Sequence, residues 1–82
     1  SNMKYEIKDF RNDGDNKFVG LFVSNDNGKS LAVDKQVPLV DGETDAYYVQ
    51  QAISLAQAEI DDWNNESSVV GKTFNTETGE FE

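Results

Sequence analysis

The stretch Lys17-Phe-Val-Gly-Leu-Phe-Val23 decides the fold, because it is apolar on both faces of an extended chain. Side chains alternate between the two faces of a strand. Aliphatic residues occupy one face and phenylalanines the other: Val19, Leu21 and Val23 against Phe18 and Phe22. Strands that are buried on both sides usually lie inside a sheet. We therefore predict a central strand here, with a partner strand on each side.

The flanking sequence supplies both partners. Lys4–Phe10 alternates polar and apolar residues, and the cluster Asn12–Asn16 has the composition of a turn. On the other side, Asn27-Gly28 is a strong signal for a type I′ hairpin. A third strand over 31–37 follows, and Pro38 ends it because proline cannot donate to a strand ladder. The first forty residues are therefore expected to form a three-stranded antiparallel meander.

A long helix is expected after the meander, from Asp45 to Trp63, with Thr44 or Asp45 capping its first turn. We expect Asn64–Ser68 to break the helix. The apolar residues of the helix recur at three- and four-residue spacing and form one stripe, which we expect to pack on one face of the sheet. The stripe contains Val49, Ala52, Ile53, Ala56, Ile60 and Trp63, widened by Tyr48 and Leu55.

The C-terminal residues predict a short strand or hairpin. Val69–Asn75 can form a fourth strand, and Thr76–Gly79 reads as a turn that leads to Phe81. The expected fold class is thus α+β, in the order β-β-β-α-β, as a single domain over residues 3–82. Ser1-Asn2 before Met3 resembles the remnant of a cleaved expression tag, and we leave it out of the fold.

Charge excludes several classes of partner. The chain has 16 acidic against 7 basic residues and a formal net charge of −9. Nucleic acids and anionic lipids attract lysine and arginine, so we expect neither direct nucleic-acid binding nor membrane binding. The charge is also uneven, because Gln36–Gly71 contains seven acids and no base. The C-terminal half is the electronegative half.

The residue types do not favour catalysis or metal binding. The chain lacks histidine and cysteine, which removes the usual nucleophile and base pairs. Glu59, Asp62 and Glu66 share one flank of the predicted helix, where a solvated acidic face is the simpler interpretation. The oxygen-rich loops fail the register of a calcium-binding EF-hand. We expect no catalytic residue, no cofactor and no metal site.

A protein-binding surface is the better candidate. One helix cannot cover both faces of the sheet, so the phenylalanine face needs another cover. Either the C-terminal segment covers it, or a partner or a second copy does, which would make the protein a homo-oligomer. The candidate interface residues are Phe10, Phe18, Phe22, Phe74 and Phe81.

A second candidate surface is acidic. The residues are Glu59, Asp61, Asp62 and Glu66. Acidic side chains near a helix C-terminus are locally unfavourable because the helix dipole is negative there. This surface would suit a basic partner, and the chain would then act as an inhibitor or as a mimic of DNA. Solubility alone also explains an acidic surface.

Three short stretches carry a resemblance: Gln57-Ala-Glu-Ile-Asp-Asp-Trp63, Gly71-Lys-Thr-Phe-Asn75 and Thr78-Gly-Glu-Phe81. They resemble the closing region of small uncharacterised proteins of tailed bacteriophages, especially phages of marine cyanobacteria. The resemblance covers the last third to half of the chain, and no binding residue can be carried over from it. It implies a role in the virion, in assembly or in host takeover.

Together these observations predict a non-enzymatic protein that acts through protein contacts. Its partner is itself or a basic host or phage protein. The resemblance places it in the cytoplasm of the host cell or in the virion, and we find no N-terminal secretion signal. The preferred role is structural or in assembly, and the alternative is acidic inhibition.

Overall fold

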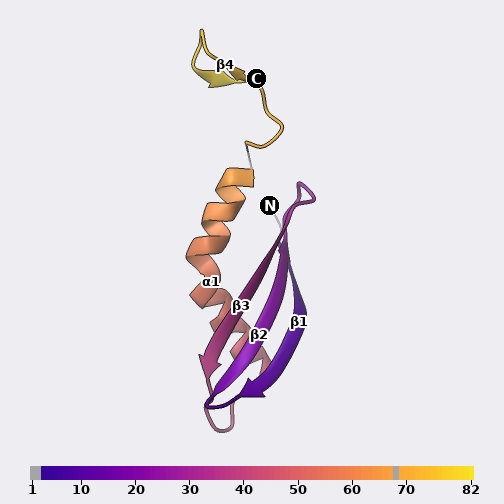
Figure 1. Cartoon of the computed structure of the whole chain (residues 1–82), viewed down its shortest axis with the longest axis vertical. Coiled ribbons are helices and arrows are strands. Elements are labelled where there is room, and N and C mark those ends of the chain that lie inside the picture. The colour runs from indigo at the N-terminus through magenta and orange to yellow at the C-terminus, as the bar shows by residue number, and fades with distance from the viewer. Residues whose placement is uncertain (1–2, 68) are drawn as a thin grey trace.

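The computed structural model describes residues 3–67 and 69–82, so the expectation for Ser1-Asn2 lies outside the described residues. It shows a three-stranded antiparallel sheet, one helix and a short C-terminal hairpin (Figure 1), which confirms the predicted α+β fold. No helix in the described ranges is long and apolar enough to cross a membrane. The elements are β1 (Lys4–Asp13), β2 (Asn16–Ser24), β3 (Ser30–Pro38), α1 (Asp45–Ser67), β4 (Phe74–Asn75) and β5 (Glu80–Phe81).

β2 is the central strand, as its two apolar faces predict. It pairs with β1 on one side and with β3 on the other. The β1–β2 turn has only Gly14 and Asp15 between the paired residues Asp13 and Asn16, and Gly14 adopts a φ of 59°. This is the positive φ that a type II′ turn requires at its first central residue.

The β2–β3 connection differs from the prediction. The last strand pair is Ser24 with Ser30, so the loop has five residues instead of two. No non-glycine residue in the described part of the chain has positive φ, which excludes the predicted type I′ turn at Asn27-Gly28. The side chain of Asn25 organises the loop instead, because its Oδ1 accepts the backbone N–H groups of Asn27 and Lys29 at 3.0 and 3.1 Å.

α1 starts where the sequence predicts and ends later. Thr44 caps it, with Oγ1 accepting the N–H of Tyr47 at 3.1 Å. The helix continues through Asn64 to Ser67, so the predicted end at Trp63 is wrong. Asn64 Oδ1 accepts the side-chain amide of Asn25 at 3.3 Å, and this contact with the β2–β3 loop gives the last turns a tertiary partner. Ser68 lies outside the described residues.

The core lies between α1 and one face of the sheet. Small residues, Ala52 and Ala56, face the sheet and are fully buried, which lets the helix approach closely. Leu55, predicted to widen the apolar stripe, is 58% exposed instead. The buried core consists of Val19, Leu21, Val23, Val33, Val37, Tyr48, Ala52, Ala56 and Ile60.

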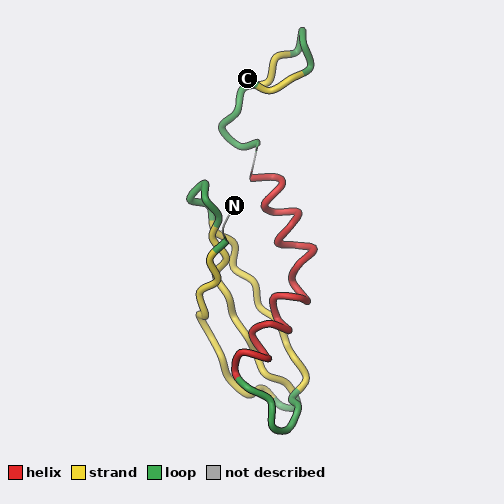
Figure 2. The backbone as a smooth tube through the Cα atoms, turned by 180° about the vertical axis from the view of Figure 1, so that it is seen from behind, coloured by secondary structure: helices red, strands yellow, loops and turns green. Residues whose placement is uncertain are grey.

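α1 covers only part of the sheet. It runs along one side of the sheet (Figure 2) and packs on β3 and β2 rather than on β1. A helix is about 10 Å wide and strands are about 4.8 Å apart, so one helix covers about two strands. On the helix side of β1, Tyr5 and Ile7 therefore stay exposed, whereas Phe10 packs against the core.

Residues 69–82, which we call the C-terminal arm, project beyond the end of α1 (Figure 1). Their hairpin makes no contact with the three-stranded sheet or with α1. The chain is consequently elongated, 58 × 18 × 18 Å. Its radius of gyration is 16.6 Å, against about 12 Å for a compact chain of this length.

Candidate protein-interaction surfaces

The C-terminal arm presents two aromatic rings to solvent. Phe74 and Phe81 are register partners across the β4–β5 hairpin, with ring centroids 5.3 Å apart in an edge-to-face arrangement. They are 51% and 52% exposed. Asn75 holds the turn, because its Oδ1 accepts the backbone N–H of Glu77 at 2.9 Å. The Nζ of Lys72, within the arm, lies 6.0 Å from the Phe81 ring centroid. The hairpin is locally well defined, and about half of each ring residue still faces solvent.

The opposite face of this hairpin is polar, and polar groups near it form hydrogen bonds within the arm. The Asn75 side-chain amide donates to Glu82 Oε2 at 2.8 Å, and the backbone N–H of Glu82 donates to the Thr73 carbonyl at 2.8 Å. The arm is thus amphipathic. Because an isolated two-stranded hairpin is at best marginally stable in water, the exposed phenylalanine face is a surface that packing would stabilise.

The face of the sheet opposite α1, called the outer face here, carries Phe18 and Phe22. Cationic side chains from β1 lie over both rings. The guanidinium carbon of Arg11 is 4.3 Å from the Phe18 centroid, and Lys8 Nζ is 5.0 Å from that of Phe22. Cation–π contacts of this kind contribute about 0.5–1 kcal/mol at exposed sites. The β4–β5 hairpin does not contact the sheet and so does not cover this face, which β1 shields in part.

Gly20 separates the two phenylalanines in β2. It is buried because Asp9 and Asp34, its partners on β1 and β3, pack around it. A Cβ added at Gly20 would lie 3.1 Å from Asp34 Oδ1 and 3.2 Å from Asp9 Cβ. Asp9 also pairs with Arg11 at 3.1 Å. On the outer face, aromatic rings thus alternate with charged side chains, and there is no continuous apolar patch among the residues described.

Phe10 does not join the outer face. A β-bulge at Lys8 shifts the register between Ile7 and Asp9, so that Phe10 pairs with Val19. Because the bulge adds one residue, Phe10 moves to the same face as Ile7, which is the helix side of the sheet. The five predicted interface phenylalanines consequently lie at three separate places: Phe18 and Phe22 on the outer face, Phe74 and Phe81 on the arm, and Phe10 beside α1.

An apolar groove lies between β1 and the first turns of α1. Ile7, Phe10, Asp45 and Val49 line a cavity of about 240 Å³, and Ile7 is 43% exposed. Lys17 extends beside it, with Nζ 4.8 Å from the Phe10 ring centroid. The sequence reasoning missed this groove. Tyr5 and Ile7 alternate on one face of an edge strand, and a helix that covers two strands leaves that face open.

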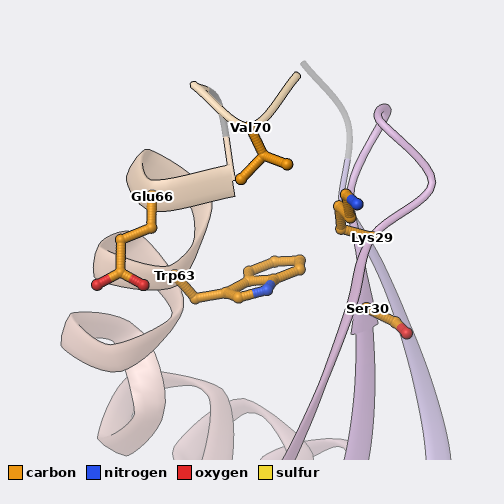
Figure 3. Close-up of a pocket in the computed structure, with 5 residues that line it drawn as sticks. All are labelled: Lys29, Ser30, Trp63, Glu66 and Val70. Atoms are coloured by element: carbon orange, nitrogen blue, oxygen red, sulfur yellow. The ribbon is translucent and has the colours of Figure 1, made fainter. Parts of the chain in front are cut away.

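A second hollow lies at the other end of α1. Lys29, Ser30, Trp63, Glu66 and Val70 line a cavity of about 260 Å³ (Figure 3). The Trp63 indole extends from the helix toward the β2–β3 loop, with Val70 above it (Figure 3). The indole is partly buried against the core and therefore also serves as packing.

The predicted acidic residues on α1 are not equivalent. Glu59 pairs with Lys35 of β3 at 2.5 Å, so its charge is partly neutralised. Asp61 accepts a hydrogen bond from the Gln57 side-chain amide at 2.9 Å.

The net charge is divided even more unevenly between the sheet and the rest of the chain than between the segments compared above. Residues 3–38 contain six acids and six bases, whereas 39–82 contain ten acids and one base, so the net charge of −9 lies entirely in the second segment.

Among the described residues, no group of three or more histidine, cysteine, aspartate or glutamate side chains is placed to hold a metal ion. The described residues present four surfaces: the apolar face of the β4–β5 hairpin, the groove between β1 and α1, the partly shielded outer face and the acidic side of α1. Neither a protein-family model, nor a curated protein, nor a solved structure matches this chain.

Proposed function

We propose that this chain acts through protein–protein contacts made by its C-terminal arm, as a structural or assembly module that associates with itself. We propose that this role is non-enzymatic and is carried out in a virion or during virion assembly. One observation supports the proposed self-association. Phe74 and Phe81 form an ordered apolar surface that no part of the sheet or of α1 contacts.

Burial of this surface would be favourable. Full burial of a phenylalanine contributes about 1.5–3 kcal/mol, and about half of each ring residue is still exposed. Covering both would therefore contribute roughly 2 kcal/mol. A partner would also stabilise a hairpin that is marginal by itself.

The test is the mass of the full chain in solution, measured by analytical ultracentrifugation over a range of concentrations. We expect an oligomer that the Phe74→Glu and Phe81→Glu substitutions dissociate. Thr76→Glu is the matched control, because it adds the same charge to the turn of the same hairpin and leaves the phenylalanine face intact. An oligomer that withstands both phenylalanine substitutions would contradict the proposed role of the arm.

A second function is supported by the charge distribution. Residues 39–82 carry the entire net charge, and Asp62 and Glu66 lie exposed on α1. This acidic helix would suit a basic host or phage protein, as an inhibitor or a DNA mimic. Capture of such a protein should weaken with salt and should be lost when Asp61, Asp62 and Glu66 are replaced by lysine. Capture that survives these substitutions would exclude this function.

A further inference from the structure

We propose that the arm of one copy docks in the groove between β1 and α1 of a second copy, and that two such contacts close a reciprocal dimer. This inference rests on the proposed function and names the acceptor surface. The occupant is the phenylalanine face of β4–β5, and the acceptor is the groove lined by Ile7, Phe10 and Val49.

In the structure the arm does not occupy the groove of its own chain, because it projects beyond the opposite end of α1 (Figure 1). Along α1, Val49 and Ser67 are about 27 Å apart, at about 1.5 Å per residue. The chain from Ser67 to Phe74 spans at most about 25 Å when fully extended. It is shorter than that, because the N–H of Lys72 donates to the Val69 carbonyl at 3.1 Å and closes a turn. Docking within one chain would require a nearly fully extended linker and the loss of this turn, so a second copy is the favoured source of the arm.

The exposed area agrees with this assignment. The chain exposes 5704 Å², whereas a compact monomer of 9.2 kDa exposes about 4,900 Å². The excess of about 800 Å² is the area that each partner contributes to a standard protein interface, also about 800 Å². A dimer that buries both arms would thus bring the exposed area per chain to that of a compact protein.

The chemistry of the two surfaces is complementary. The groove has aliphatic and aromatic walls, and its volume of about 240 Å³ exceeds the roughly 150 Å³ that accommodates a benzene ring. It therefore has room for one of the two rings, with the other packed at its rim. Glu80 and Glu82 flank Phe81 in the sequence, and Lys17 lies beside the groove. Asp45 at the rim repels these carboxylates. Lys17 beside the groove and Lys72 beside the Phe81 ring offset this repulsion, and apolar packing supplies the affinity.

The position of the surfaces allows both contacts at once. The arm extends from the C-terminal end of α1, whereas the groove includes Asp45 and Val49 at the N-terminal end. In Figure 1 these are opposite ends of the molecule. Two copies that lie antiparallel therefore each place an arm next to the groove of the other. A closed two-fold arrangement of this kind uses every arm and every groove.

The experiment uses two variants of the full chain, Phe81→Glu in the arm and Ile7→Glu in the groove. Ile7 is 43% exposed, so the fold should tolerate glutamate, and circular dichroism checks this. Each variant should raise the dimer dissociation constant at least about tenfold. Leu55→Glu is the control, because Leu55 is an exposed apolar residue on α1 that does not line the groove.

Mixing the two variants is decisive. Phe81→Glu keeps an intact groove and Ile7→Glu keeps an intact arm, so the mixture regains one of the two contacts and should recover dimer mass. If Ile7→Glu remains as dimeric as the control, the groove is not the acceptor and this inference fails, whereas dissociation of Phe81→Glu would still support the proposed function. Two monomeric variants that do not restore a dimer on mixing would also overturn the inference.

Discussion

Phe74 and Phe81 lie opposite each other across the β4–β5 hairpin, with ring centroids 5.3 Å apart, and about half of each residue faces solvent. Such a pair is usually part of a core. Here it belongs to a hairpin that contacts neither the sheet nor the helix. Residues 3–67, which we call the body, contain the whole buried core. The body is therefore expected to fold without the arm.

Deletion of residues 73–82 should leave the body folded. Because the hairpin contacts no other element, we expect the free energy of unfolding to change by no more than about 0.5 kcal/mol relative to full-length Phe81→Glu, which is monomeric in this account. Urea unfolding followed by Trp63 fluorescence measures it. A loss of several kcal/mol would show that the arm belongs to the core.

Phe22→Glu should not change the solution mass. Phe22 lies on the outer face beneath Lys8, away from both the arm and the groove. We expect a destabilisation of about 1 kcal/mol from the lost packing, with the oligomer retained in light scattering. Dissociation by this single substitution would instead assign the interface to the outer face of the sheet.

Tyr48→Phe should loosen the segment that leads into α1. The Tyr48 hydroxyl donates to the Val40 carbonyl and accepts the Val40 N–H, each at 2.9 Å. Loss of both bonds should cost about 1–2 kcal/mol and should speed hydrogen exchange of the Val40 amide. Tyr47→Phe is the matched control, and an equal effect of both substitutions would contradict this role of the Tyr48 hydroxyl.

Gly20→Ala should destabilise the sheet by about 1 kcal/mol or more. The Asp34 carboxylate can rotate away from the new methyl group, but Asp9 Cβ, 3.2 Å away, is fixed to the backbone of β1. Gly20→Val should cost more than alanine. Thermal unfolding of the two variants tests this order, and a stabilised Gly20→Ala would show that β1 moves freely.

Lys35 and Glu59 join β3 to α1. Their side chains are 28% and 49% exposed, so the pair should contribute about 0.5 kcal/mol and less at high salt. A double-mutant cycle with Lys35→Met and Glu59→Gln measures the coupling energy. A coupling that does not change with salt would argue against an ionic contribution.

The elements of the body follow from local sequence, whereas the surfaces depend on details that local sequence does not encode. The two apolar faces of β2 and the stripe on α1 predict a central strand and a covering helix, and both are present. The helix end was missed because Asn64 is a weak helix former that gains a partner, Asn25, from a distant loop.

The candidate surfaces depend on register, and one residue changes it. Simple alternation places Phe10 on the face opposite Ile7, but the bulge at Lys8 reverses this and makes both residues part of one groove. The sequence contains no clear signal for that bulge. The exposure of Phe74 and Phe81 could not be predicted from the sequence either, because their spacing fits a hairpin whether or not that hairpin packs on the sheet.

The mass of the full chain at low and at high salt tests the central claim most directly. Apolar contacts are little screened by salt, so light scattering should give twice the chain mass of 9.2 kDa in both conditions. A mass of 9.2 kDa in both would contradict self-association through the arm.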